Sequence, residues 1–592
     1  MASLCSFSCL VPYYKNYHNR SRQFDKFSKP KYSSKSASKV VHAKAVTTVE
    51  PVLRRSGNYS PSLYSFDYIQ SLSSEYVGED YKARAETLKG TVKMMISKLG
   101  NLLNTLEMID DLQRLGISYH FENEKRNLLE IIYSNHYKSH EKWSGLDLKV
   151  KALGFRLLRQ HGYQVPQEIF HNFKDKTQNL KPDKLEDVME ILNLYEASYL
   201  SFEDEHILDE VRDFTTKYLK DNQHKIDESS YISSLVSHAL ELPLHWRVPR
   251  VEARWFIEVY EKIIDMNPTL LEFAKLDYNM VQAGHIEDLK ETSRWWRDIK
   301  WDKKLKFSRD RLVEHFLWST GFAHLPQHSL FRRTITRVNS SITAIDDVYD
   351  VYGTLEELEQ FTNVMKRWDI NAIEDLPDYM KICFIGFFNT INEIAYNTLT
   401  DTGFLILPYL TKAWAGLCKV YLVESWWYNS GYTPTLQEYL DNAHVSISGP
   451  VILMHANFLT SAGLNNEILQ CMTRHEKIVY YSTLIFRLAD DLGTSTDELT
   501  RGDTPKSIQC YMHESGATEE EARRYVKELI IETWKKLNKE RALAYNSQFA
   551  SEFIDFAINI PRMAQFMYRE GDGHGHPEIN KSHMSSLFFN PI

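Results

Sequence analysis

Apolar residues recur at intervals of three and four along most of the chain after residue 60. The stripe between Glu79 and Leu115 contains, among others, Leu88, Val92, Ile96, Leu99, Leu103 and Leu106. This spacing places apolar side chains on one face of an α-helix. Similar stripes occupy residues 185–220, 250–290, 335–365, 405–425, 476–492 and 519–545, and alternating, strand-like runs are nearly absent. The pattern therefore predicts an all-α fold.

The length of the chain indicates that these helices form more than one core. A chain of 592 residues is too long for one ordinary hydrophobic core. Proline and glycine punctuate the helical pattern, and the Asn267-Pro268 pair marks one such break. We therefore expect two helical domains, at residues 54–265 and 266–592. No run of about 18 uncharged apolar residues occurs, so we expect no membrane span.

The N-terminal residues differ in composition from the rest of the chain. Residues 1–45 carry nine Lys or Arg residues, and Asp25 is their only acid. Segments that are rich in serine, basic and poor in acids are typical of organellar transit peptides. We expect residues 1–53 to be such a peptide, without a fixed structure. A basic tail that carries no address is the alternative.

Charge and cysteine content exclude several classes of function. The net charge is −9, and leaving out residues 1–45 makes it about −17. Such an acidic body argues against binding to nucleic acid. The six cysteines form no close pairs outside the basic leader that would suit zinc or a disulfide framework. A reducing compartment with free thiols is therefore expected.

The first candidate for chemistry is the sequence Ile345-Asp346-Asp347-Val348-Tyr349-Asp350. Residues four apart on an α-helix differ by about 40° around its axis, so Asp346 and Asp350 share a face and Asp347 points away. Two carboxylates on an apolar helix require a cation or solvent. Carboxylate oxygens suit Mg²⁺, which often binds together with substrate phosphates. An acidic patch at a solvated helix end is the alternative.

A second acidic set follows about 140 residues later. Asp490, Thr494 and Glu498 are spaced by four residues, so they project from one face of a helix. Two carboxylates and a hydroxyl form another set of hard oxygen ligands. A polar helix end is again the alternative, but the apolar residues that precede Asp490 favour burial.

Basic and aromatic residues accompany both acidic sets. Arg309, Arg487 and Lys506 are candidates for binding a diphosphate, because guanidinium and ammonium groups suit that anion. Taken one at a time, each could equally be a surface charge or a structural ion pair. Aromatic faces stabilise carbocations through their quadrupole. The candidates for the lining of an apolar cavity are Trp318, Tyr481, Phe486 and Tyr568.

The order of these motifs resembles the plant class I terpene synthases, in particular the plastid monoterpene synthases of flowering plants. The similarity runs from about residue 54 to the C-terminus. The segments that carry it are Arg54-Arg55, residues 155–162, 194–198 and 242–247, Arg309-Asp310-Arg311, Asp346 to Asp350, residues 432–435, and Asp490 to Glu498. In this family the tandem arginines are followed by a Trp, where this chain has Tyr64. The tandem-arginine motif is associated with cyclisation, so cyclisation stays an expectation.

The resemblance implies a fold, a site and a reaction. It implies a catalytically silent, α-barrel-like domain at 54–265 and a class I α-bundle that holds the active site at 266–592. It also implies three Mg²⁺ ions, or Mn²⁺, and a plastid stroma location. The implied metal ligands are Asp346, Asp350, Asp490, Thr494 and Glu498.

The remaining implied roles concern the substrate, a prenyl diphosphate. Arg309, Arg487 and Lys506 would bind its diphosphate, with Arg311 near a closing lid. Trp318 and Tyr568 would line the cavity, and the break at Ser446-Ile447-Ser448-Gly449-Pro450 would expose carbonyls to a cation. The expected reaction is ionisation of geranyl diphosphate, followed by cyclisation or quenching to a monoterpene. The expected assembly is a monomer or a weak homodimer.

Several related activities are less well supported by the sequence. A chain-elongating prenyltransferase normally has two Asp-rich motifs of the first kind, and a class II cyclase has a DxDD motif that is missing here. An isoprene synthase needs bulky aromatic residues in its pocket, and Asn339 is not one. A synthase with an acyclic product (linalool, myrcene or ocimene) and a sesquiterpene synthase acting on farnesyl diphosphate remain as alternatives. A non-enzymatic helical scaffold would show damaged ligand sets, and these are intact.

Overall fold

The computed structural model describes residues 54–177, 184–228, 230–460, 476–501, 503–545 and 551–592. The expected transit peptide at 1–53 lies outside these described residues. Helices account for nearly all regular structure, and no strand occurs in the described ranges. The predicted all-α fold is confirmed.

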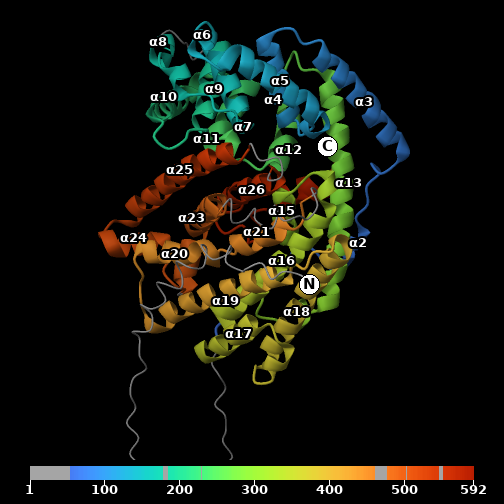
Figure 1. Cartoon of the computed structure of the whole chain (residues 1–592), viewed down its shortest axis with the longest axis vertical. Coiled ribbons are helices and arrows are strands. Elements are labelled where there is room, and N and C mark those ends of the chain that lie inside the picture. Colours follow the sequence, from blue (N-terminus) through green and yellow to red (C-terminus); the bar gives the residue numbers. More distant parts are fainter. Residues whose placement is uncertain (1–53, 178–183, 229, 461–475, 502, 546–550) are drawn as a thin grey trace, which may run out of the picture.

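The N-terminal helices from α3 to α12 form the upper part of the molecule in Figure 1, whereas α2 lies lower, against α13. The helices within residues 79–115, 185–220 and 250–260 match the predicted apolar stripes, and the buried faces of the N-terminal helices pack against one another. The main helices are α2 (Phe66–Ser71), α3 (Glu79–Ser97), α4 (Leu102–Arg114), α5 (Glu122–Ile132), α7 (Leu148–Gln160), α9 (Leu185–Ser198), α10 (His206–Asn222), α11 (Tyr231–Glu241) and α12 (Pro249–Tyr260).

A 32-residue helix, α13 (Pro268–Ile299), links the two halves. Its start follows from the sequence. The Asn267 side chain caps the helix by accepting hydrogen bonds from the amides of Thr269 (3.0 Å) and Leu270 (3.2 Å). Pro268 is tolerated in the first turn because a backbone N–H at that position would have no partner within the helix. Figure 1 shows α3 alongside α13, so a helix of the first half packs on the first helix of the second.

The C-terminal helices surround the candidate site. In the described part of the chain, α15, α16, α21, α23 and α26 contact one another in that order, and α26 returns to α15 to close a ring. The bounds of the helices are α15 (Leu312–Phe322), α16 (Ser329–Asp347), α17 (Leu355–Arg367), α18 (Asp378–Thr402), α19 (Leu407–Ser430), α20 (Leu436–Ser446), α21 (Gly449–Asn457), α23 (Glu476–Arg501), α24 (Ser507–Ser515), α25 (Glu519–Ala544) and α26 (Ser551–Met567).

The two halves meet through polar and aromatic contacts. The Asn538 side chain in α25 donates to the carbonyls of Tyr199 and Ser201, both at 3.1 Å. Trp246 stacks on Trp534 with ring centroids 5.6 Å apart. Buried apolar residues of both halves form one continuous core, so the division at residues 265 and 266 stays a prediction. No helix in the described ranges combines the length and apolar character needed to cross a bilayer.

Candidate active site

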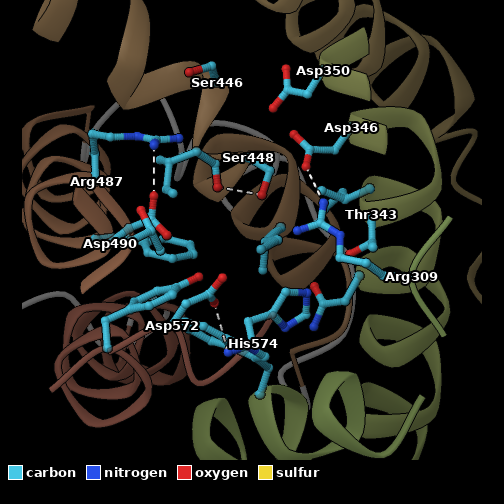
Figure 2. Close-up of a pocket in the computed structure, with 18 of the residues that line it drawn as sticks. Arg309, Thr343, Asp346, Asp350, Ser446, Ser448, Arg487, Asp490, Asp572 and His574 are labelled. Carbon is cyan, nitrogen blue, oxygen red and sulfur yellow. Dashed lines mark hydrogen bonds and ion pairs between the residues drawn. The ribbon is translucent and has the colours of Figure 1, made fainter. Parts of the chain in front are cut away.

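The first acidic set lies where α16 passes into a π-helical turn, Val348–Tyr352. Asp346 lies in the last turn of α16 and Asp350 in the π turn, and both line one cavity. The π turn was not expected, because the sequence indicated continuous α-helix. The two carboxylates still converge, as Figure 2 shows. Burial and the neighbouring Asp346 carboxylate raise the pKa of Asp350 well above its usual value.

Arg309 faces the first acidic set from the loop before α15. Its guanidinium pairs with the Asp346 carboxylate, and its Nε lies 2.9 Å from Oδ1 of Asp347. Burial opposes the charge on Arg309, but Asp347, Tyr59 and Asp346 outweigh that cost and raise its pKa. Arg309 therefore stays charged at the edge of the cavity.

The second acidic set comes from α23 on the opposite side of the cavity (Figure 2). Arg487 Nη1 donates to Oδ2 of Asp490 at 2.8 Å, and one turn later Thr494 also lines the cavity. The Thr494 hydroxyl is buried and has no hydrogen-bond partner in the described structure. Lys506, just before α24, completes this side. Glu498 lies on α23, but its side chain is outside the described residues.

The break between α20 and α21 forms another wall of the cavity. Ser448 has a left-handed φ of 67°, and Ser446, Ile447 and Ser448 all line the cavity. A Cβ on Gly449 would lie 2.4 Å from a methyl carbon of Thr483 in α23, so α21 approaches α23 closely only because this residue is glycine. The sequence predicted this break from the Gly449-Pro450 pair.

Aromatic residues line the cavity between the two acidic sets. Trp318 lies with its ring centroid 5.1 Å from that of Phe486 and 6.0 Å from that of Tyr568. Tyr481, the fourth candidate, contacts Tyr480 instead and is not among the residues that line the cavity. Residue spacing placed Tyr481 on a helix but could not specify which face of that helix meets the cavity.

Comparison with known proteins identifies the family to which this site belongs. Residues 63–240 match the family model "Terpene synthase, N-terminal domain", and residues 297–536 match "Terpene synthase family, metal binding domain". The chain belongs to the terpene synthase family. The expected family is thereby confirmed, and the metal-binding domain that it implies spans both acidic sets.

Individual relatives agree with this assignment. The synthase is 64% identical to a chloroplastic R-linalool synthase of Artemisia annua over 95% of this chain and 98% of that protein. Its structure is similar to that of limonene synthase with 2-fluorolinalyl diphosphate, with a TM-score of 0.86, 44% identity, and coverage of 91% and 100%. It is also similar to isoprene synthase from grey poplar leaves in complex with three Mg²⁺ ions and dimethylallyl-S-thiolodiphosphate, with a TM-score of 0.80, 44% identity, and coverage of 90% and 99%. The expected plastid location is confirmed by the chloroplastic relatives.

The N-terminal residues 54–64 of the synthase cross to the catalytic half. Arg54 forms an ion pair with Glu357 (2.8 Å) and donates to the carbonyl of Tyr352 (2.9 Å). Arg55 donates to the carbonyl of Asp350 at 2.9 Å and pairs with Asp503. The tandem arginines therefore connect the first acidic set to the loop that carries Lys506.

Arg311 and Tyr64 act outside the cavity. Arg311 is fully buried and donates to the carbonyls of Ser60 (2.9 Å), His574 (3.0 Å) and Gly575 (2.8 Å). It thus joins residues 54–64 to the loop after α26. Tyr64 packs against Phe589, with ring centroids 5.1 Å apart, and does not line the cavity.

Sequence reasoning missed five polar residues of the synthase that line the cavity, Glu424, Asp572, His574, His315 and Thr343. Glu424 in α19 accepts hydrogen bonds from Ser446 (2.5 Å) and Asn442 (2.9 Å). It is a lone acid in an apolar stretch, which was the available signal. The glycine-rich run at 571–575 was the signal for the loop residues.

The loop after α26 is fixed by its own acid. The Asp572 carboxylate accepts hydrogen bonds from the amides of His574 (3.1 Å) and Gly575 (2.6 Å). Burial holds the pKa of His574 far below its usual value, and its Nδ1 has no hydrogen-bond partner in the described structure. A neutral imidazole therefore faces the same cavity as the acidic sets.

Proposed function

We propose that this terpene synthase ionises geranyl diphosphate, releases the diphosphate, and cyclises or quenches the resulting cation to a monoterpene. The observation that carries the proposal is the composition of one cavity. It is lined by Asp346 and Asp350 of the first set, Asp490 and Thr494 of the second, three basic residues and an aromatic wall; the basic residues are Arg309, Arg487 and Lys506. The two sets and the basic residues suit a metal-bound diphosphate, and the aromatic wall suits an apolar cation.

Asp346 and Asp350 on one side, and Asp490, Thr494 and Glu498 on the other, would hold divalent ions. Their oxygen donors fit Mg²⁺ or Mn²⁺. The buried Thr494 hydroxyl without a partner and the raised pKa of Asp350 are features that a bound cation would relieve. Three Mg²⁺ is the number in the isoprene synthase complex, and we propose the same number here. When bound, the ions supply charge stabilisation to the departing diphosphate.

The basic residues would bind and orient the diphosphate. Burial opposes the charge on both arginines, but neighbouring phenol and carboxylate groups outweigh it and raise the pKa of both Arg309 and Arg487. For Arg487 these groups are Tyr439, Asp490 and Asp491, so both guanidinium groups are charged at neutral pH. A charged donor aimed at the place where negative charge develops favours ionisation over mere binding. Lys506 adds an ammonium on the side of α23.

The aromatic wall would stabilise the allylic cation and keep water from it. Trp318 and Phe486 are buried and Tyr568 is partly buried, and a desolvated aromatic face contributes about 2 kcal/mol to a cation above it. An acyclic alcohol of the linalool type is the second candidate product, because the relative with 64% identity is an R-linalool synthase. That product requires one water to reach the cation.

Two further proposals concern organisation. The domains are assigned to residues 54–265 and 266–592, which agrees with the start of α13 at Pro268. We expect the enzyme to be a monomer or a weak homodimer, and sedimentation at several protein concentrations would measure this.

The test uses protein that begins at residue 54, with geranyl, farnesyl and dimethylallyl diphosphates in separate reactions. Gas chromatography should detect a ten-carbon product from geranyl diphosphate with Mg²⁺. That product should disappear with EDTA and return with excess Mg²⁺. A fifteen-carbon product alone would replace the proposal with a sesquiterpene synthase, and turnover that ignores EDTA would overturn the metal mechanism.

A further inference from the structure

Each acidic set begins with two adjacent aspartates that differ in position. The first of each pair, Asp346 and Asp490, lines the cavity. The second, Asp347 and Asp491, is fully buried and is not among the residues that line it. A buried carboxylate is costly unless it is paired, so the contacts of these two inner residues indicate what they do.

Asp347 binds the loop that carries Arg309. Its Oδ2 accepts hydrogen bonds from the Ser308 hydroxyl (2.9 Å) and the Arg309 amide (2.8 Å), and its Oδ1 lies 2.9 Å from Nε of Arg309. One carboxylate therefore fixes both the backbone and the side chain of a residue that faces the cavity.

Asp491 makes the corresponding contacts on the opposite side. Its Oδ1 lies 3.2 Å from Nη1 of Arg487 and accepts from the Tyr439 hydroxyl at 2.9 Å. Its Oδ2 accepts from the amide of Ser507 at 3.1 Å, the residue directly after Lys506. This carboxylate thus holds one cavity-lining arginine and the backbone beside a cavity-lining lysine.

A third buried aspartate shows what a purely structural pairing looks like. Asp288 in α13 accepts from the Ser329 hydroxyl and from Nε of Arg332 at 2.9 Å. Arg332 then donates to the carbonyls of Ala323 (3.0 Å) and Leu325 (2.7 Å) and does not line the cavity. The contacts of Asp288 therefore lead only to core residues. Those of Asp347 and Asp491 hold residues that line the cavity.

We propose that Asp347 and Asp491 are positioning residues that hold Arg309, Arg487 and the Lys506 loop in place for the diphosphate. A carboxylate that already holds the arginine restricts its rotamers before substrate arrives, so less conformational entropy is lost when the diphosphate binds. The inference rests on the proposed function, because it presumes a diphosphate in the cavity.

The experiment compares Asp347→Asn, Asp491→Asn and the control Asp288→Asn. Calorimetry with inorganic pyrophosphate and Mg²⁺ measures anion affinity without turnover, and thermal melting measures stability. We expect Asp347→Asn and Asp491→Asn each to weaken pyrophosphate binding about tenfold and to raise KM for geranyl diphosphate more than they lower kcat. Asp288→Asn should lower the melting temperature and leave pyrophosphate affinity unchanged.

A double-mutant cycle tests whether Asp347 acts through Arg309. In an Arg309→Gln background, Asp347→Asn should weaken pyrophosphate binding by less than about twofold, because the group it positions is gone. Ser308→Ala is a milder variant, with an expected loss of about threefold, for use if Asp347→Asn does not fold.

The outcomes separate the possible explanations. If Asp347→Asn, Asp491→Asn and Ser308→Ala all kept the wild-type affinity for pyrophosphate, the positioning role would be overturned. The two aspartates would then only stabilise the helix ends on which they lie. Equal losses with and without Arg309 would overturn the route through that arginine. Wild-type protein that binds no pyrophosphate and turns over no geranyl diphosphate would instead overturn the proposed function itself.

Discussion

The buried acid Glu252 of the N-terminal half is enclosed by protein, whereas Asp346 and Asp490 of the catalytic half line a cavity. Glu252 in α12 accepts from Arg114 (2.9 Å) with one carboxylate oxygen and pairs with His238 (2.7 Å) through the other. In the catalytic half, Asp346 and Asp490 are paired with arginines and also line the cavity. Burial alone therefore does not mark a catalytic acid. What matters is whether its surroundings leave access for a further ligand.

The largest expected effect is on turnover. Replacement of Asp346 with alanine removes a cavity-facing carboxylate, and we expect kcat to fall about a thousandfold or more because charge stabilisation of the leaving group is lost. Helical circular dichroism should be unchanged. Glu356→Ala, which removes an exposed acid of α17, is the matched control and should keep normal activity. Near-normal activity of Asp346→Ala would remove this residue from the proposed metal site.

The next effect is on stability and lies in the N-terminal half. We expect Glu252→Gln to lower the free energy of unfolding by about 3–5 kcal/mol, because it leaves Arg114 buried without its charge partner. Burial opposes ionisation of Glu252, but His238 and Arg114 lower its pKa to about 2. The ionised form therefore stabilises the fold above pH 4.5, and this contribution is lost as the pH falls toward 2.

Urea unfolding of Glu252→Gln at pH 7 measures this loss. Glu258→Gln on the same helix is the control, because Glu258 is 59% exposed and its pairing with Arg254 should be worth less than about 1 kcal/mol. If Glu252→Gln lost kcat while keeping its stability, the contrast between the two halves would be wrong.

Glu314 in α15 is a buried acid of the catalytic half that should behave in the opposite way. Burial raises its pKa to about 7, and neither carboxylate oxygen has a hydrogen-bond partner in another described residue. The protonated form stabilises the fold below pH 4.5, and this contribution is lost as the pH rises to about 7. Glu314→Gln should therefore be about 1–3 kcal/mol more stable than wild type at pH 8 and equal to it near pH 4. Equal stability of the two proteins at both pH values would contradict the raised pKa.

The smallest effect is expected from the N-terminal residues. Deletion of residues 1–53 should change kcat/KM by less than about twofold, because the contacts with the catalytic half in the described structure begin at Arg54. Deletion of residues 1–55 removes both tandem arginines and should lower kcat/KM by more than the shorter deletion does. If deletion of residues 1–53 abolished activity while circular dichroism stayed normal, residues that precede Arg54 would be shown to contribute to the site.

The sequence predicted those parts of the site that lie close together along one helix. The four-residue spacings within Asp346 to Asp350 and within Asp490 to Thr494 were enough to place each pair on a common face, because helix geometry is regular over one turn. The helical content and the breaks at Pro268 and Gly449 followed from local signals in the same way.

The parts that were missed depend on contacts between distant segments. Glu424 is brought to the cavity by the packing of α19 on α20 and α21, and Asp572 by a loop after α26. No local pattern encodes such packing. The π turn at Val348–Tyr352 also escaped prediction, because the sequence continues with residues that are compatible with an α-helix.

The contacts of the tandem arginines have a consequence for how the chain is made. Arg55 and its partner Asp503 are 448 residues apart, and Arg54 and Glu357 are 303 apart. On the ribosome these arginines emerge long before the groups they bind, and contacts of such long sequence separation form late in folding. The link between the first acidic set and the loop that carries Lys506 is thus completed by a segment that is made long before its partners, so it can form only after synthesis has passed Asp503.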